Sequence, residues 1–314
     1  GRRLFTGNDD GTAAVEFPTG ISDARRAQLA RTALIDYPVT GEQNAAYLAG
    51  DAGREERNGG NLRNRATLLG DIVSSSPAFS PDTDTVFVGS NDGMLHAFNA
   101  ANGRELFGYL PGGLDWSALG GSSRPDYSHR YFVDGPIVVS SRRETSGRNV
   151  LVGALGKGGR GLYALDVTSP SSFSANDFKW EVRSLDGAMG LVQSRPVIGR
   201  LNNGTTAVIT ANGINSGNGQ AALILLDVDS GDTVRILGTG VGSAVQDSPQ
   251  SNGLTSAVGW DADGNGTVDY VYGGDMLGNV WKFDVSSSNS ALWSIVDNAP
   301  LFTATDAAGN RQPI

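Results

Sequence analysis

One stretch of the chain, D-A-D-G-N-G-T-V-D, carries oxygen-donating side chains at regular spacing. Asp261, Asp263 and Asn265 alternate along it, so a tightly turning backbone can direct all three oxygens at one point. Thr267 would then offer its backbone carbonyl, and Asp269 would complete the shell with one or two carboxylate oxygens. EF-hand loops hold calcium in this way, with ligands at alternating positions. The stretch therefore predicts a Ca2+ site formed by these residues.

The stretch departs from the full EF-hand loop at its end. Gly266 stands where that loop needs a sharply bending glycine, but Tyr272 stands where its final glutamate would be. The predicted site is therefore a shorter loop that ends at Asp269 and leads into a strand. The alternative is an acidic, glycine-rich turn that binds nothing, because Asp, Asn and Gly favour turns by conformation alone. Closely spaced carboxylates repel one another unless a cation lies between them, which favours calcium.

The composition favours an all-β protein. The 314 residues include 44 glycines and only 18% charged residues, a balance typical of short strands joined by turns. The net charge of -9 and the lack of a Lys/Arg-rich run argue against a nucleic-acid partner or an anionic membrane surface. Without cysteine, the chain has no thiol catalysis, thiolate metal site or disulfide. Because it begins with Gly1, we expect a mature form or fragment of a longer protein.

Residues 1–67 differ from the rest and are predicted to form a lead-in with short helices. Ser22 could cap a helix whose apolar positions extend to Ile35, and a second helix is predicted over residues 43–48. We expect both helices to pack on the main body and residues 54–65 to form an exposed polar connector. No catalytic or binding role is assigned to this part.

Residues 68–314 are predicted to form the blades of an incomplete β-propeller. Repeats of roughly 60 residues each contain a strand, a glycine-rich turn, a second strand and a further strand. The second strands close on Asn99, Asp166, Asp227 and Asp284, and another short strand, marked by Pro77, Pro136, Pro196 and Ala257, lies ahead of each repeat. This pattern predicts four blades plus the start of a fifth. Because an open arc exposes sheet edges, we expect the natural chain to continue past Ile314.

Other conspicuous residues are predicted to be structural, and no catalytic residue is assigned. His96 lies within a predicted strand and His129 precedes two aromatic residues, with no carboxylate cluster nearby, so both are expected to pack or to form hydrogen bonds. The glycine-rich turn at 156–161 lacks the ending of a phosphate-binding loop and is expected to join two strands. Asp275, just past the acidic loop, is expected to shape a turn.

Several motifs in combination resemble those of a known family. They are L-L-G-D-I-V-S-S-S-P at 68–77, V-F-V-G-S-N-D-G-M-L-H-A-F-N-A at 86–100, S-H-R-Y-F-V-D-G-P at 128–136, G-G-R-G-L-Y-A-L-D-V-T at 158–168 and the stretch at 261–284. Together they resemble the C-terminal domain of the type IV pilus biogenesis and tip-associated adhesin family. The resemblance implies a modified seven-bladed propeller in which the five calcium ligands tune pilus extension against retraction.

The same resemblance implies a place and partners for the protein. It would act outside the cytoplasm, at the cell surface or pilus tip, and would bind pilus components such as minor pilins or a host or surface receptor. Nucleic acid is not an expected partner, and we expect a monomer without a transmembrane segment.

Two other interpretations start from the same residues. The blades are also similar to those of quinoprotein dehydrogenases, but this chain lacks the adjacent cysteines that cover the quinone, and its calcium loop is local rather than gathered from several blades. We therefore predict that the protein is not an enzyme. The remaining interpretation is a propeller that presents loops to a protein partner, with calcium as a structural ion.

Overall fold

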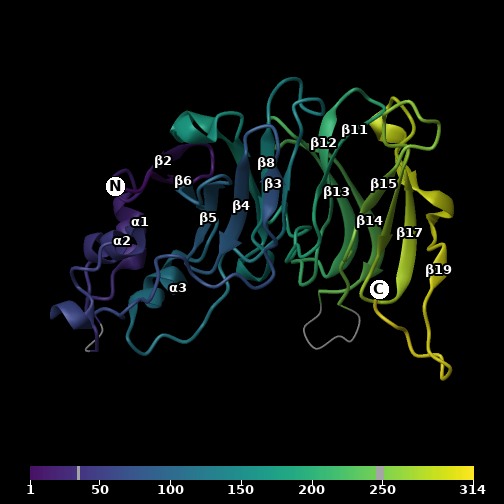
Figure 1. Cartoon of the computed structure of the whole chain (residues 1–314). Helices are drawn as coiled ribbons and strands as arrows, with labels where there is room; N and C mark the ends of the chain where they lie inside the picture. The colour runs from purple at the N-terminus through teal and green to yellow at the C-terminus, as the bar shows by residue number, and fades with distance from the viewer. Residues whose placement is uncertain (34–35, 245–250) are drawn as a thin grey trace.

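The computed structural model describes residues 1–33, 36–244 and 251–314, which form an arc of four β-sheets with short helices at its N-terminal end (Figure 1). The first sheet has the repeat strands β3 (Ala78–Ser80), β4 (Thr85–Ser90), β5 (Met94–Asn99) and β6 (Glu105–Leu110). The second has β7 (Ile137–Val139), β8 (Val150–Ala154), β9 (Gly161–Asp166) and β10 (Phe178–Arg183). The third has β11 (Val197–Arg200), β12 (Thr206–Ala211), β13 (Gln220–Asp227) and β14 (Thr233–Gly242). The fourth has β15 (Val258–Trp260), β16 (Tyr270–Gly274), β17 (Asn279–Asp284) and β18 (Ser294–Ile295), and β19 (Phe302–Thr303) also pairs with β17.

These sheets confirm the predicted propeller blades. The repeat strands within each sheet are antiparallel neighbours in chain order, so each sheet is a meander. Strands β5, β9, β13 and β17 end at the predicted closing residues Asn99, Asp166, Asp227 and Asp284. The predicted short strand ahead of each repeat also forms, and it begins directly after the marking residue Pro77, Pro136, Pro196 or Ala257.

Neighbouring sheets pack face to face, and successive residues of one strand serve two interfaces. In β13, Leu223 and Leu225 join the cluster that also holds Trp281 of the fourth sheet. Ile224 and Leu226 point the other way, into the cluster shared with the second sheet. Side chains alternate between the two faces of a strand, so a continuous apolar run lets one sheet bury both faces. The third sheet is therefore buried on both of its faces.

The predicted helices form, although the first is shorter than expected. Helix α1 (Asp23–Leu29) begins where the Ser22 hydroxyl accepts a hydrogen bond from the Arg25 amide at 3.1 Å, as the sequence predicted. It ends at Leu29 because Ala30 is extended and the next amide, of Arg31, bonds to the Val39 carbonyl instead. The predicted apolar position Ile35 lies outside the described residues. Helix α2 (Gly41–Ala49) covers the second predicted helix, and a third, α3 (Trp116–Gly120), follows the first sheet.

The lead-in is bound more closely to the first sheet than the sequence suggested. Strand β1 (Leu4–Gly7) runs parallel to β6, and β2 (Ala14–Glu16) pairs with β1, so the first sheet has six strands. The prediction of an exposed connector at 54–65 was wrong at Glu55. That side chain is only 1% exposed, and its carboxylate forms an ion pair with Arg65 at 2.9 Å, because a buried carboxylate needs a partner.

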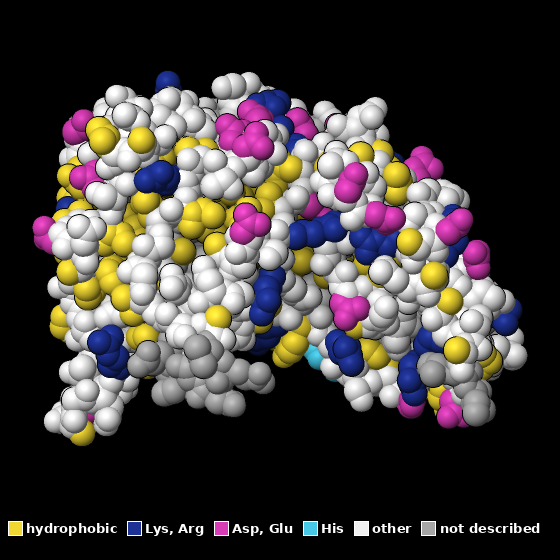
Figure 2. Space-filling view, turned by 180° about the vertical axis from the view of Figure 1, so that it is seen from behind, with side chains coloured by type: hydrophobic (Ala, Val, Ile, Leu, Met, Phe, Trp, Pro, Cys, Tyr) yellow, Lys and Arg dark blue, Asp and Glu magenta, His cyan; other side chains and the backbone are white. Residues whose placement is uncertain are grey.

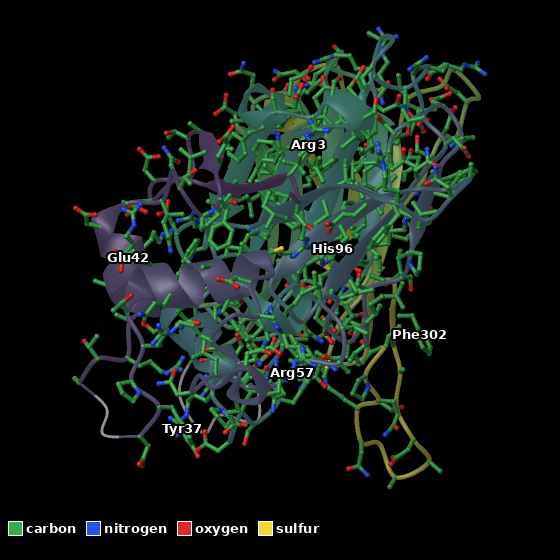
Figure 3. All side chains as sticks on the ribbon, turned by 60° about the vertical axis from the view of Figure 1, so that its left-hand side comes forward. Arg3, Tyr37, Glu42, Arg57, His96 and Phe302 are labelled. Carbon is green, nitrogen blue, oxygen red and sulfur yellow. The ribbon has the colours of Figure 1, made fainter. Side chains whose placement is uncertain are left out.

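The outer face of the fourth sheet is exposed to solvent. Val258 and Trp260 are 63% and 51% exposed, and Phe302 projects away from the body of the molecule (Figure 3). Hydrophobic side chains gather on the half of the molecule that holds this sheet (Figure 2). After β19, the chain turns back, and the Ile314 amide donates to the Asp275 carbonyl at 3.1 Å. The tail thus supplies an outer strand of the fourth sheet, and residues 304–314, where the start of a fifth blade was predicted, lie beside that sheet.

Candidate metal centre

The acidic loop joins the first two strands of the fourth sheet. Trp260 at the end of β15 pairs with Tyr270 at the start of β16, and the Asp269 amide donates to the Trp260 carbonyl at 3.0 Å. The loop is therefore closed at its base by a regular hairpin. The prediction that a strand, not a helix, follows Asp269 is confirmed.

Asp261 organises the backbone of the loop. Its carboxylate accepts hydrogen bonds from the amides of Gly264 and Gly266, each at 2.7 Å. Both glycines have positive φ angles, 78° and 86°, which side-chain-bearing residues rarely adopt. The hydrogen bond from Gly266, with those from Gly264 and Asn265, holds the pKa of Asp261 below its usual value. The carboxylate is thus kept ionised and turned into the loop.

Three of the predicted ligands converge. One carboxylate oxygen each of Asp261, Asp263 and Asp269 lies within 4.8 Å of the others. Two oxygens bound to one calcium ion at its usual distances can be at most about 5 Å apart, so this spacing fits a shared ion. Asp263 is exposed, whereas Asp269 is only 6% exposed. The cluster therefore has one buried and one solvent-facing side.

Asn265 and Thr267 lie in the same loop, with their side chains engaged in hydrogen bonds. The Asn265 amide oxygen accepts a hydrogen bond from the Thr267 amide at 2.8 Å and contacts the Thr267 hydroxyl. The Asn265 amide nitrogen donates to Asp263 at 3.0 Å. The Thr267 hydroxyl also contacts Asn202 Oδ1 at 2.9 Å, so only its backbone carbonyl is left for the predicted role. The five-residue ligand set remains a prediction.

Asn202 is a residue of this site that the sequence analysis missed. Its side-chain amide donates to Asp269 Oδ1 and to the Val268 carbonyl, each at 3.0 Å. It lies in the turn between β11 and β12, which is the same position in the third sheet as the acidic loop in the fourth. Aligning the repeats at that turn, L-N-N-G-T, would have placed Asn202 beside the loop.

Asp275, predicted to shape a turn, is fully buried between β16 and β17. Its carboxylate accepts hydrogen bonds from three side chains and two backbone amides. The donors are Asn252 Nδ2 at 2.9 Å, Asn279 Nδ2 at 2.9 Å, Trp281 Nε1 at 2.8 Å, and the amides of Leu277 and Asn279 at 2.9 Å. It stands at the opposite end of β16 from the acidic loop, so its role is to hold the sheet together.

His96 is buried and hydrogen-bonded, as predicted, but it does have carboxylates beside it. Its Nε2 lies 3.0 Å from Asp92 Oδ2, and its Nδ1 lies 2.8 Å from Glu105 Oε1. Burial disfavours the charged ring, but the two carboxylates outweigh it and raise the pKa of His96 to about 9. Arg2 also pairs with Glu105, at 2.7 Å. His96 therefore belongs to an interior charge network next to the helical lead-in (Figure 3).

The other predicted structural residues lie in ordinary settings. His129 is exposed and its Nε2 lies 2.8 Å from Asp71 Oδ2. The glycine-rich turn at 156–161 joins β8 to β9, as predicted.

Comparison with known proteins identifies the family. A model of the PilY1 beta-propeller domain matches residues 68–314, which is most of the chain. This chain belongs to the PilY1 β-propeller domain family. The resemblance noted in the sequence is thereby confirmed.

Members of the PilY1 family are similar to this chain over most of its length. A type IV pilus biogenesis factor PilY1 homolog from Xylella fastidiosa is 37% identical and covers 88% of this chain and 22% of the relative. The type IV pilus biogenesis factor PilY1 of Pseudomonas aeruginosa strain UCBPP-PA14 is 34% identical and covers 83% of this chain and 26% of the relative. The chain thus spans about a quarter of the length of these relatives.

A solved structure supports the same fold. The crystal structure of the Pseudomonas aeruginosa PilY1 C-terminal domain matches with a TM-score of 0.58 and 32% identity, over 73% of this chain and 48% of that one. In the described part of the chain, no helix is both long and apolar enough to cross a membrane.

Proposed function

We propose that this chain is the calcium-binding propeller domain of a type IV pilus biogenesis factor, and that calcium in its acidic loop regulates pilus extension and retraction. The calcium part depends on the convergence of Asp261, Asp263 and Asp269 in one loop. The pilus part is supported by the relatives, which are named as type IV pilus biogenesis factors. The domain acts without catalysis, outside the cytoplasm, at the cell surface or pilus tip.

Calcium would act on the loop by electrostatics. Three carboxylates held this close repel one another, and a divalent cation between them converts that repulsion into attraction. Asp269 and Thr267 also contact Asn202 in the third sheet. An ion that fixes Asp269 therefore also fixes the contact between the third and fourth sheets. A partner such as a minor pilin or a surface receptor would recognise the ordered surface.

Calcium binding is tested by titration of the purified chain. Wild type is expected to release heat that saturates with CaCl2, and its free energy of unfolding should rise by about 2.7 kcal/mol at a hundredfold excess over the Kd. Asp263→Asn and Asp269→Asn should lose both effects. Asp306→Asn is the matched control, because Asp306 also accepts backbone hydrogen bonds in an exposed turn but lies in the tail. Wild type that neither binds nor gains stability at millimolar calcium would contradict the proposal.

The pilus role is tested in cells that carry this gene. Asp263→Asn in the chromosomal copy should change the number of surface pili and the rate of twitching, because calcium could no longer bias the loop. Asp306→Asn should leave both unchanged. If calcium binds in vitro but Asp263→Asn cells move and make pili like wild type, the site is structural and the regulatory proposal fails.

A further inference from the structure

A groove in the helical part of the molecule concentrates arginine side chains. Its lining residues come from α1, α3 and the segments that follow these helices. Both helices lie at the N-terminal end of the arc, and the fourth sheet lies at the other end (Figure 1). The cavity volume is about 580 Å3. Its charged lining residues are Arg31, Arg124, Asp126 and Arg130. Three positive charges and one negative charge leave a local excess of two positive charges, in a chain whose net charge is -9.

Arg31 is buried without a carboxylate partner among the described residues. Its side chain is 8% exposed, and its guanidinium donates to the Gly120 carbonyl, to Ser123 Oγ at 2.6 Å and to the Tyr37 carbonyl at 3.4 Å. Its Nε is buried and has no hydrogen-bond acceptor in the described structure. Carbonyls and a hydroxyl satisfy some of its donors, but they bring no opposite charge. Asp126 attracts this charge without forming an ion pair with it. A buried charge without an ion pair is costly, and an anion in the groove would offset that cost.

The two other arginines of the groove are accessible. Arg124 forms a two-pronged ion pair with Asp126, at 2.8 and 2.7 Å, and this pair is half exposed. Arg130 is exposed, and its guanidinium has no ion pair in the described part of the chain. Gln28, Ser117 and Ser128 add neutral polar groups to the lining. Arginine presents a planar set of donors that matches carboxylates and other oxyanions.

We propose that this groove binds an oxyanion, carried as a carboxylate on an acidic polypeptide. The volume supports a polypeptide rather than a small free ion, because it lies in the range of pockets that enclose whole ligands and far exceeds the size of one phosphate. The acidic residue enters between Arg31 and Arg130, and the remaining peptide lies along the neutral side chains of α1 and α3. This site is independent of the calcium loop and of the pilus role.

The proposal is tested with the purified chain and a fluorescently labelled hexaglutamate peptide. Anisotropy should rise to saturation with hexaglutamate but not with hexaglutamine, and the apparent Kd should increase with salt, because exposed charges are screened. Arg130→Gln and Arg124→Gln should each weaken binding by about tenfold, the loss expected for one charge-assisted hydrogen bond. Both side chains are surface-accessible, so these variants should fold. Arg104→Gln, at an exposed turn outside the groove, should bind like wild type.

Two results would overturn the proposal. If hexaglutamate fails to bind, or binds Arg130→Gln and Arg124→Gln as tightly as Arg104→Gln, the groove is not the site. If inorganic phosphate protects the chain from thermal unfolding through Arg130 while hexaglutamate does not bind, the groove holds a small free oxyanion and the polypeptide ligand is wrong. Competition by phosphate against bound hexaglutamate, lost in Arg130→Gln, would support a shared oxyanion site.

Discussion

Replacing Asp275 by alanine is expected to lower the free energy of unfolding by about 3 to 5 kcal/mol, because it removes the acceptor of a buried hydrogen-bond network. The carboxylate is fully buried, and no Lys or Arg among the described residues pairs with it. Its removal would leave the buried side-chain donors of Asn252, Asn279 and Trp281 without an acceptor. Each buried unsatisfied donor costs about 1 to 3 kcal/mol. The total expected for the three donors is smaller than the upper end of their summed costs, because the surrounding side chains can relax and recover part of the lost hydrogen bonding. Since whole domains are stable by only about 5 to 15 kcal/mol, the effect should be large.

Urea denaturation followed by tryptophan fluorescence and circular dichroism measures this loss. Asp275→Asn keeps the shape and one acceptor oxygen, so it should cost less than alanine, about 1 to 3 kcal/mol. Asp306→Ala is the control. The Asp306 carboxylate also accepts several hydrogen bonds, but it is exposed, so water can accept those hydrogen bonds when the carboxylate is removed. If the free energy of unfolding of Asp275→Ala lies within about 1 kcal/mol of the wild-type value, the hydrogen bonds to Asp275 do not stabilise the fold as argued.

Two further predictions concern the charge network and the acidic loop. The pKa of His96 is raised to about 9 in the folded chain, so its stabilising charge is fully present below its unfolded pKa of about 6.5 and is lost as pH rises through 9. The difference in unfolding free energy between wild type and His96→Gln should therefore shrink by about 3 kcal/mol between pH 6.5 and 9.5. If plots of unfolding free energy against pH stay parallel for the two proteins, the charge network does not stabilise the fold. Asn202→Ala should weaken calcium binding about tenfold in calorimetry, because residues that orient a ligand affect affinity on this scale; an unchanged Kd would show that Asn202 does not position Asp269.

The repeat architecture could be predicted from the sequence because its signals are local. Each second strand closes on an Asn or Asp after an apolar run, and each first strand follows Pro or Ala at a similar spacing. The convergence of Asp261, Asp263 and Asp269 was also predictable, since all three lie on one short loop whose glycines permit the turn. The spacing of nearby residues determines such features, and contacts with distant segments are not needed to predict them.

Features that depend on contacts between distant segments could not be predicted in this way. Strand β1 joins the first sheet through a parallel pairing with β6, about a hundred residues later, and no turn sequence marks such a pairing. Asn202 of the third sheet forms a hydrogen bond with Asp269 of the neighbouring fourth sheet. His96 meets Glu105 from the next strand and Asp92 from the turn before it, and that arrangement depends on strand register.

The two ends of β4, β12 and β16, which stand at equivalent positions in their sheets, have different roles. At one end, the residue after the strand bonds to a segment that leads into a first strand: Asn91 accepts from the Phe132 amide, Asn212 from the Leu254 amide, and Asp275 from Asn252. A polar side chain at this end is therefore a structural requirement of the first, third and fourth sheets. At the opposite end, where the acidic loop lies, a turn of one sheet bonds to the residue that precedes the corresponding strand of the next sheet. Asn149 Nδ2 donates to Asp82 at 2.8 Å, and Asn202 Nδ2 donates to Asp269 at 3.0 Å. The acidic loop therefore lies at a contact between neighbouring sheets, so a cation held by its three carboxylates would act directly on that contact.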